Sequence, residues 1–418
     1  MGRNLAEKIL SNHIVEGELR KGSSIGIKID QTLTQDSTGT MAYLQLEAMG
    51  IDKVKTKRSV AFVDHNMLQQ GFENADDHEF IKTVASKHGV YFSKPGNGVC
   101  HQVFLERFAV PGETLIGSDS HTPTAGAVGM LAMGAGGLDV ALAMAGGAYY
   151  INVPKVCKVN IIGSFKPMVT GKDVVLEVLR RLTVKGGVSK IFEYGGEGIK
   201  NLSVPQRATI TNMGAELGAT TSIFPSDERT LEFFKAQGRE EDWFEFKADE
   251  DAVYDEEYTI DLSALRPTIA FPHLPENTKT IDEIQESVAI DQVVIGSCTN
   301  GRLDDLRIAA EVLEGRHVAK GIRCIVIPAT QKIYMEAMEE GLLKTFIEAG
   351  AVVSTPTCGP CLGGYMGVLA EGERCVSTTN RNFVGRMGHV KSEVYLASPA
   401  VAAASAVAGQ IACPEQFD

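Results

Sequence analysis

From residue 292 onward, short apolar segments alternate with longer amphipathic ones. We expect strands at 292–295, 323–327 and 352–354, separated by helices at 303–313 and 331–340. This alternation is typical of a parallel sheet with helical crossovers, in which ligands bind beyond the carboxyl ends of the strands. The pattern therefore predicts an α/β fold, and it directs attention to the residues that follow each strand.

Two cysteine motifs occupy those positions. Gly-Ser-Cys298-Thr-Asn follows the first strand, and Thr-Cys358-Gly-Pro-Cys361-Leu-Gly-Gly follows the third, where Gly and Pro exclude a regular helix or strand. We interpret the three cysteines as ligands of an iron–sulfur cluster. Three protein thiolates on a four-iron cluster leave one iron without a protein ligand, and such an iron can act as a Lewis acid.

Two other interpretations of the cysteine pair stay open at this point. A zinc site needs further ligands, and the sequence has no second Cys-x-x-Cys and no His-x-x-x-His. Cys-Gly-Pro-Cys is also the thioredoxin tetrapeptide, although here it lies late in the chain, after Thr357. A redox pair would form a reversible Cys358–Cys361 disulfide and would not depend on Cys298.

Three segments near the N-terminal third of the chain carry a histidine beside polar or acidic residues. They are Asp64-His65, Cys100-His101 and Asp119-Ser120-His121. A single histidine of this kind is usually a surface or core residue. The chain has only nine histidines, however, and clustered ionisable groups mark functional sites, so we expect at least two of the three segments to share a pocket.

Other polar residues have a structural and a functional interpretation. We expect residues 30–40 to form a polar loop in which Asp36 or Ser37 caps a helix at 40–49. Asn212 and Glu216 lie four residues apart, which places them on one helical face, by default as a surface pair.

Arg381 and Arg386 flank a glycine near the C-terminal end of the chain. Guanidinium groups bind carboxylates through two parallel hydrogen bonds, so the pair predicts an anion site. The alternative is a pair of surface salt bridges.

The length of 418 residues predicts more than one domain. The division we predict is 1–154, 155–281 and 282–418. Within the second part, 155–162 has the pattern of an edge or half-buried strand, and the acidic stretch 240–261 predicts an exposed excursion. The proline-rich segment 267–282 predicts a linker.

Composition excludes several classes of function. A net charge of −13 without a basic run argues against nucleic-acid binding, and no apolar stretch, including 396–411, has the length and purity of a membrane span. Eight scattered cysteines favour a reducing cytoplasm over a disulfide scaffold. Five of them we interpret as buried or incidental thiols, namely Cys100, Cys157, Cys324, Cys375 and Cys413.

With these motifs and Asn380-Arg-Asn-Phe-Val-Gly-Arg386, the chain resembles the aconitase superfamily, and within it the large subunits of the isopropylmalate-type and homoaconitase-like dehydratases. The resemblance extends from Gln35-Asp36 to the alanine-rich C-terminal segment. It implies three α/β domains with mainly parallel sheets around a [4Fe–4S] cluster. It also implies that Cys298, Cys358 and Cys361 hold that cluster and leave one iron without a protein ligand.

The resemblance also implies roles for the other candidates. His101 with Asp119 would protonate the leaving hydroxyl, because a carboxylate partner fixes the imidazole tautomer and keeps a proton available. His65 with Asp64 and His121 with Glu216 would be the other carboxylate–imidazole pairs. The implied substrate-binding and cluster-adjacent residues are Gln35, Ser120, Asn212, Asn300, Asn380, Arg381 and Arg386.

One departure from the single-chain members concerns their fourth, swivelling domain. This sequence ends at Asp418, after the third predicted domain. We therefore expect a separate small subunit to carry that domain and the base that removes the Cα proton, and we expect the large chain alone to be inactive.

The implied reaction is dehydration and rehydration of a hydroxy di- or tricarboxylate, with isomerisation of 2-isopropylmalate in leucine biosynthesis as the first expectation. Alternative substrates are homocitrate, citrate, methyl- or dimethylmalate and citraconate. A non-catalytic, iron-sensing or RNA-binding relative is the alternative from another class. The acidic charge and the presence of all the cysteine, histidine and arginine motifs argue against it.

Overall fold

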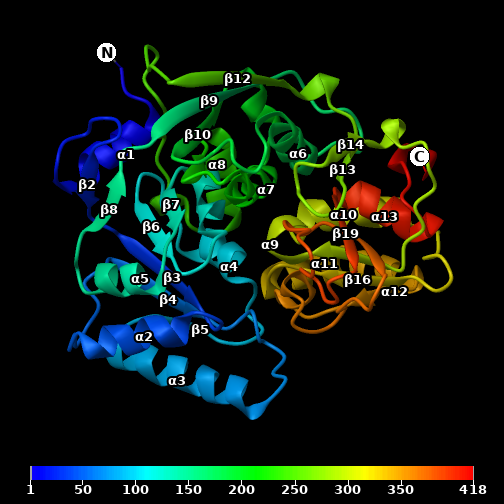
Figure 1. Cartoon of the computed structure of the whole chain (residues 1–418), viewed down its shortest axis with the longest axis horizontal. Coiled ribbons are helices and arrows are strands. Elements are labelled where there is room, and N and C mark those ends of the chain that lie inside the picture. The colour runs from blue at the N-terminus through cyan, green and yellow to red at the C-terminus, as the bar shows by residue number, and fades with distance from the viewer. Residues whose placement is uncertain (1, 418) are drawn as a thin grey trace.

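Four β-sheets organise the computed structural model of the chain, which describes residues 2–417 (Figure 1). The first predicted domain contains a five-stranded sheet and a small antiparallel one. The five-stranded sheet has the order β5-β4-β3-β6-β7 and is built from β3 (Gln31–Gln35), β4 (Arg58–Phe62), β5 (Tyr91–Ser93), β6 (Thr114–Gly117) and β7 (Leu131–Gly134). The antiparallel sheet has the order β1-β2-β8 and is built from β1 (Ile14–Glu16), β2 (Ser24–Ile27) and β8 (Tyr149–Asn152).

All five strands of the larger sheet are parallel, and helices cover both of its faces. The helices of this part are α1 (Leu5–His13), α2 (Gly39–Ala48), α3 (Phe72–His88), α4 (Cys100–Arg107), η1 (Thr122–Val128) and α5 (Gly137–Met144). Side chains alternate along β4: Ala61 packs with α2, α3 and α5, whereas Val60 and Phe62 pack with α4 and η1. Because helices cover both faces of the sheet, polar residues lie at the carboxyl ends of its strands.

Two predictions for residues 30–40 are wrong. Residues 31–35 form β3, the central strand of the sheet, because every one of its side chains is buried between helical layers. The N-cap of α2 is Thr38, which makes no capping bond with its side chain. The segment is polar in sequence, but its Gln and Thr side chains form hydrogen bonds to neighbouring strands and loops, for example Thr32 to Ser59 at 2.6 Å.

The second part of the chain forms a parallel sheet with the order β11-β10-β9-β12. Its elements are β9 (Lys155–Ile162), α6 (Gly171–Leu182), β10 (Lys190–Gly195), η2 (Glu197–Asn201), α7 (Val204–Met213), η3 (Gly214–Leu217), β11 (Thr221–Ile223), α8 (Glu228–Ala236), η4 (Glu240–Asp242), β12 (Glu256–Asp261) and η5 (Leu262–Ala264). β9 is an interior strand, although its burial alternates as predicted. The acidic stretch is not wholly an excursion, because β12 pairs with β9 along its full length.

The third part forms a seven-stranded sheet with the order β14-β13-β19-β18-β15-β16-β17. Its strands are β13 (Thr268–Ala270), β14 (Thr278–Thr280), β15 (Gln292–Gly296), β16 (Arg323–Ile327), β17 (Val352–Val353), β18 (Arg374–Ser377) and β19 (Glu393–Ala397). Its helices are η6 (Ile281–Glu283), α9 (Ser297–Asn300), α10 (Leu303–Leu313), α11 (Gln331–Glu339), α12 (Leu342–Glu348), η7 (Gly359–Leu362), α13 (Pro399–Ala408) and η8 (Pro414–Phe417).

The predicted rhythm of strands and helices from residue 292 is confirmed, whereas the predicted linker is wrong. β13 and β14 lie within 267–282 and join the seven-stranded sheet through antiparallel pairing of β13 with β19. The proline-rich composition conceals these strands because each is only three residues long. The division of the chain into three domains remains a prediction. Its second part, 155–281, includes this hairpin, although the hairpin pairs with the seven-stranded sheet.

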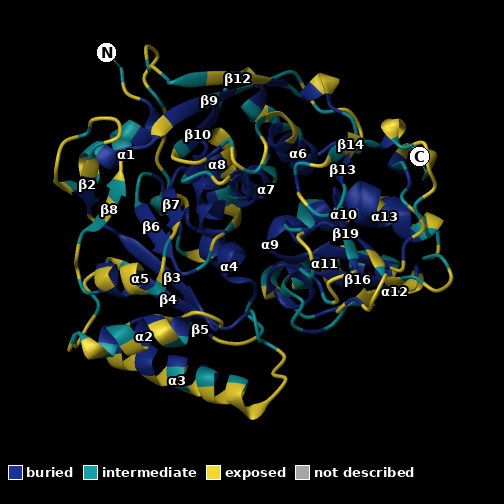
Figure 2. Ribbon diagram, viewed as in Figure 1, coloured by how far each residue is buried: buried dark blue, intermediate teal, exposed yellow. Residues whose placement is uncertain are grey.

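Burial follows this layering (Figure 2). Central strands such as β3 and β4 are dark blue, whereas the outer faces of α3 and α12 are largely exposed. α3 ends at His88, and the following Gly89, with a positive φ of 77°, caps the helix in the left-handed conformation. Within residues 2–417, no helix combines the length and the apolar character needed to cross a membrane.

Candidate active site

The carboxyl edges of the five-stranded and seven-stranded sheets face a common cavity of about 220 Å³. Its lining residues come from loops after β3, β4, β6, β15, β17 and β18 and from the start of α4. They are Ser37, Asp64, His65, Val99, His101, Asp119, Ser120, His121, Cys298, Cys358, Cys361, Leu362, Asn380, Arg381 and Arg386. The cavity thus contains all three predicted histidine segments and all three predicted cysteine ligands.

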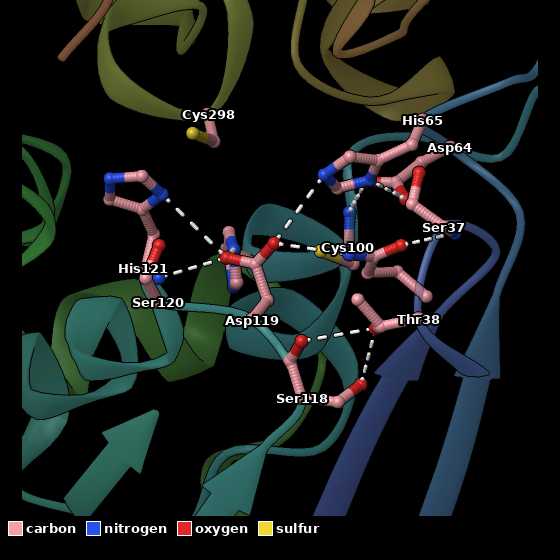
Figure 3. A network of polar contacts seen from close by, with 12 residues as sticks. Ser37, Thr38, Asp64, His65, Cys100, Ser118, Asp119, Ser120, His121 and Cys298 are labelled. Atoms are coloured by element: carbon pink, nitrogen blue, oxygen red, sulfur yellow. Dashed lines mark hydrogen bonds and ion pairs between the residues drawn. The ribbon is translucent and has the colours of Figure 1, made fainter. Parts of the chain in front are cut away.

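Asp119 is the centre of the polar half of the cavity (Figure 3). Its Oδ1 lies 2.7 Å from His101 Nε2 and accepts the backbone N–H of His121 at 2.8 Å. Its Oδ2 lies 3.4 Å from His65 Nε2. Burial alone would raise the pKa of Asp119, but the charge of His101 and the hydrogen bonds from His101, His121 and His65 hold it well below its usual value. Asp119, whose side chain is about 10% exposed, is therefore a largely buried carboxylate surrounded by hydrogen-bond donors.

His65 is held between two carboxylates. Its Nδ1 lies 2.8 Å from Asp64 Oδ1, and its other ring nitrogen faces Asp119. Burial opposes the charged imidazolium, yet Asp64 and Asp119 raise the pKa of His65 well above its usual value. Asp64 Oδ2 in turn accepts the N–H of Cys100 at 2.7 Å, at the first residue of α4, where a helix start favours negative charge.

Asp36 holds the loop that carries Asp64 and His65. Its carboxylate accepts the backbone N–H groups of Asp64, His65 and Asn66 at 2.9, 2.9 and 2.7 Å. Although burial opposes ionisation, these bonds and the neighbouring histidines His78 and His65 lower the pKa of Asp36 to about 2. The side chain predicted as a helix cap therefore orients one edge of the cavity.

A third carboxylate–imidazole pair lies on the opposite side of the cavity. His121 Nε2 is 2.9 Å from Glu216 Oε1, and Arg381 Nε donates to both oxygens of Glu216 at 3.0 and 3.1 Å. Arg381 also donates to Ser120 Oγ at 2.9 Å. Burial opposes ionisation of Glu216, but His121 and Arg381 lower its pKa. Glu216 is only 5% exposed, so its default interpretation as a surface residue is wrong.

The three thiols occupy the other half of the cavity. Cys298 follows β15 through Gly296, whose φ is 131° and whose Cβ, if present, would lie 2.0 Å from Ile327 O. Only glycine fits that turn. Cys358 and Cys361 lie at η7, after β17, and a hydrogen bond between their thiols, aided by Arg386, lowers the pKa of Cys361 well below its usual value.

Side-chain amides and a guanidinium face these sulfurs. Asn212 and Asn380 direct their Nδ2 groups at Cys298 Sγ from 3.5 and 3.6 Å, and Arg386 directs a guanidinium nitrogen at Cys361 Sγ from 3.9 Å. Asn212 is fully buried, contrary to its default interpretation as a surface residue. Donors around buried thiols favour the thiolate form that binds metal.

The thiols fit an iron–sulfur cluster better than a single metal ion. Among residues 2–417, two groups have ligand atoms that all lie within 4.8 Å of one another, His101 with Asp119 and His121, and Asp36 with Asp64 and His65. The three cysteines do not form such a group. A single zinc ion would need all three thiolates at about 2.3 Å from the metal, and therefore close to one another. Three soft thiolates spread over a larger space suit a cluster.

Four of the predicted site residues lie behind the cavity wall. Gln35 donates to Asp119 Oδ2 at 3.4 Å, and Asn212 and Glu216 act on Cys298 and His121 as described. Asn300 bonds through Nδ2 to Asp305 at 2.9 Å, away from the cavity lining.

Three lining residues were not predicted as site residues, namely Ser37, Val99 and Leu362. Ser37 could have been found from the polar loop that it shares with Gln35. Val99 and Leu362 are ordinary apolar residues in the sequence, and no signal marks them.

A second groove of about 470 Å³ adjoins the cavity and shares Asp119, Ser120 and Arg381 with it. Glycine and alanine form much of its lining, with Met133, Tyr149 and Ile151 as the larger apolar side chains. The polar cavity thus continues into a larger space lined mainly by small residues.

Comparison with known proteins gives full-length matches. The family profile described as "Aconitase family (aconitate hydratase)" matches residues 7–409. The 3-isopropylmalate dehydratase large subunit of Caldicellulosiruptor saccharolyticus is 50% identical over 99% of this chain and 97% of its own length. The protein of the same name from Lachnoclostridium phytofermentans is 50% identical, and the 2,3-dimethylmalate dehydratase large subunit of Eubacterium barkeri is 48% identical, each over 100% of both chains.

Proposed function

The chain belongs to the aconitase family, and we propose that it is the catalytic large subunit of a hydro-lyase that isomerises 2-isopropylmalate to 3-isopropylmalate by dehydration and rehydration. Such an enzyme serves leucine biosynthesis. Relatives named as large subunits of that dehydratase, about half identical in sequence, match essentially the whole chain. Aconitase-family proteins carry a [4Fe–4S] cluster, and this chain has the cysteines to hold one.

The observation that carries the proposal is the composition of the cavity of about 220 Å³, which brings three thiols, three imidazoles and two arginines together. Cys298, Cys358 and Cys361 would hold the cluster. When bound, the cluster would supply an iron without a protein ligand, a Lewis acid that makes the substrate hydroxyl a better leaving group. The remaining chemistry concerns the carboxylates and protons of the substrate.

Arg386 and Arg381 are the groups that we assign to the substrate carboxylates. Arg386 lines the cavity, and its buried Nε has no hydrogen-bond partner among the described residues, so a donor is available for a ligand. Arg381 is fixed by Glu216 and Ser120, and this fixed orientation reduces the entropy lost when a carboxylate binds. Ser120 and Asn380 line the cavity beside these arginines.

His101 is the group that we assign to proton delivery at the leaving hydroxyl. Its Nε2 faces Asp119, while its buried Nδ1 has no partner among the residues that the structure describes. The low pKa of Asp119 keeps that carboxylate ionised beside His101 Nε2. His65 and His121, both with raised pKa values, would maintain the proton supply around Asp119.

A small subunit completes the proposed enzyme. The names of the relatives contain the words "large subunit", which supports a small partner. We propose that this partner carries the swivelling domain and supplies the base for the Cα proton.

All eight cysteines are free thiols, which supports a reducing, cytoplasmic setting.

The proposal is tested by anaerobic reconstitution of the purified chain, followed by assay of 2-isopropylmalate turnover with and without a cognate small subunit. We expect about four irons and four sulfides per chain, a brown colour that bleaches in air, and turnover only with the partner. Zinc, or a metal-free chain with a Cys358–Cys361 disulfide, would refute the cluster. A full cluster without turnover of any hydroxy-dicarboxylate would refute the activity.

A second substrate is supported by one comparison. The 2,3-dimethylmalate dehydratase large subunit is as similar to this chain as many of the isopropylmalate-type relatives are. The ratio of kcat/KM for 2-isopropylmalate and 2,3-dimethylmalate in the same reconstituted enzyme distinguishes the two. A higher value for 2,3-dimethylmalate would reassign the substrate and leave the reaction type unchanged.

A further inference from the structure

A fully buried lysine lies beneath the loop that carries Asn380 and Arg381. Lys172 is the second residue of α6, in the second part of the chain, and its side chain is 0% exposed. Its Nζ donates to Thr378 O at 2.8 Å and to Thr379 O at 2.6 Å. Lysine is almost never fully buried unless its charge is paired, yet this ammonium group bonds two backbone carbonyls rather than a carboxylate.

The two carbonyls belong to a short turn between β18 and the cavity. The turn is tied to β15 by Thr378, whose N–H donates to Val294 O at 2.9 Å and whose Oγ1 accepts the N–H of Gly296 at 2.8 Å. Gly296 leads directly into the Cys298 segment. Lys172 therefore bonds to a turn that is itself tied, through Thr378, to the segment that carries Cys298.

The next residues along the turn contact the thiols and the acid–base groups. Asn380 directs its amide nitrogen to Cys298 Sγ and donates to Asn212 Oδ1 at 3.1 Å, and Arg381 binds Glu216. An orientation error at Thr379 would be passed to both side chains, because backbone dihedrals set the direction of the residues that follow. Displacements of about 1 Å can cost about 100-fold in rate.

Keeping a lysine here has a cost, which argues for a specific role. Burial lowers the pKa of Lys172 to about 7, although Asp305 and Asp173 oppose this. A methionine would fill the same space without burying an amine. What methionine lacks is a donor for the two carbonyls of the turn.

We propose that Lys172 is a positioning residue that fixes the Thr378–Thr379 turn, and through it Asn380 and Arg381, for the substrate carboxylate. This inference rests on the proposed function. It assigns to the second part of the chain a role in the geometry of a site whose lining comes from the first and third parts.

The neighbouring residue provides a matched control. Asp173 is also fully buried on the first turn of α6, and it also bonds to the seven-stranded sheet, through the N–H of Thr268 at 2.8 Å. Thr268 lies in β13, outside the cavity lining. Loss of either side chain weakens the packing of α6 on this sheet, but only Lys172 bonds to the turn before Asn380.

The experiment compares Lys172→Met, Lys172→Gln and Asp173→Asn in the reconstituted two-subunit enzyme. We expect Lys172→Met to keep the iron and sulfide content, to lower kcat/KM by about 10- to 100-fold, and to speed hydrogen exchange at the amides of Asn380 and Arg381. Lys172→Gln keeps one donor and should recover part of the loss. Asp173→Asn should lower the melting temperature without changing kcat/KM per folded enzyme.

The outcomes separate the inference from the function on which it rests. Wild-type enzyme that fails to turn over any hydroxy-dicarboxylate overturns the proposed function. Active wild type, with Lys172→Met that melts earlier but keeps its kcat/KM and exchange rates, overturns the positioning role. Equal losses of kcat/KM in Lys172→Met and Asp173→Asn would also overturn it, since they would show a general effect of α6 packing.

Discussion

The two sheet edges that face the cavity carry different chemical groups. At the five-stranded sheet, Asp119 lies 2.7 Å from the nearest imidazole nitrogen and 3.4 Å from a second. At the seven-stranded sheet, the amides of Asn212 and Asn380 face Cys298 Sγ from 3.5 and 3.6 Å. One edge gathers carboxylate–imidazole pairs, and the other gathers thiols that face side-chain amides and the guanidinium of Arg386. Under the proposed function, these two edges are a proton half and a metal half, which meet in the cavity.

The largest effect is expected when a predicted cluster ligand is removed from the metal half. Cys358→Ser should abolish both the cluster and turnover, because two remaining thiolates cannot hold a four-iron cluster. Iron, sulfide and the visible spectrum of the reconstituted chain measure this. Cys324→Ala, a buried thiol on β16 outside the cavity lining, is the control and should keep both. Unchanged iron in Cys358→Ser would show that the ligand assignment is wrong.

Removing a group from the proton half should separate the two halves. His101→Ala should keep its full iron content but lower kcat by about 10²- to 10⁴-fold, since a positioned general acid contributes about that factor. His317→Ala, at an exposed histidine of the third part, should behave as wild type. Loss of the cluster together with activity in His101→Ala would mean that His101 is structural and that the halves are not separable.

A smaller effect is expected one layer behind the proton half. Asp36→Asn leaves one carbonyl oxygen for the three N–H groups of Asp64, His65 and Asn66. We expect a decrease in kcat of about 10-fold and a loss of stability of about 1–3 kcal/mol, with iron content unchanged. Asp76→Asn, exposed on α3, is the control. Wild-type kcat in Asp36→Asn would show that the loop keeps its orientation without the carboxylate.

The smallest effect on activity, and a clear one on stability, is expected at a buried carboxylate that has no imidazole neighbour. Glu193 accepts the N–H of Leu5 at 2.8 Å and the hydroxyl of Tyr254 at 2.6 Å, and burial raises its pKa to about 7. Asp119, which is also buried, has a lowered pKa because histidines surround it. The direction of a buried carboxylate's shift thus depends on its neighbours.

The sign of the pH effect follows from that shift. Because the folded pKa of Glu193 lies above its ordinary value, the native state binds more protons and loses stability as the pH rises from about 4.5 through 7. Glu193→Gln imitates the protonated form and should reduce the loss between pH 5 and 8 by about 1–3 kcal/mol, with kcat unchanged. Denaturation midpoints measure this, with the exposed Glu245→Gln as control. Identical pH profiles of Glu193→Gln and wild type would contradict the shift.

Much of the fold could be predicted from local patterns. α10 and β16 have the predicted bounds, because each combines a clear period with a clear cap or turn. The strands that were not predicted are either buried on both faces or only a few residues long. β3 reads as a polar loop because its threonines and glutamines find partners only in the folded sheet, and β13 and β14 are hidden among prolines.

The candidate site divides in the same way. The sequence identified residues of rare chemical type, such as Cys298, His101 and Arg386, because thiols, imidazoles and guanidiniums at strand ends are informative wherever they occur. From the sequence, Asp36 was a candidate cap of the following helix and Glu216 was by default a surface residue, and the structure contradicts both. The reason is that local spacing reports which residues share a helical turn, but not which backbone amides or imidazoles a distant loop brings near.

By itself, then, the sequence determined the α/β class, the thiol set and the imidazole set, since these follow from residue type and short-range periodicity. Only the tertiary structure decided that the two sets face one cavity of about 220 Å³, that Asp119 is shared by the histidines, and that Lys172 lies beneath the Asn380 turn. These contacts join residues far apart in the chain. Their energies depend on burial and on neighbouring charges, which exist only after the sheets have packed together.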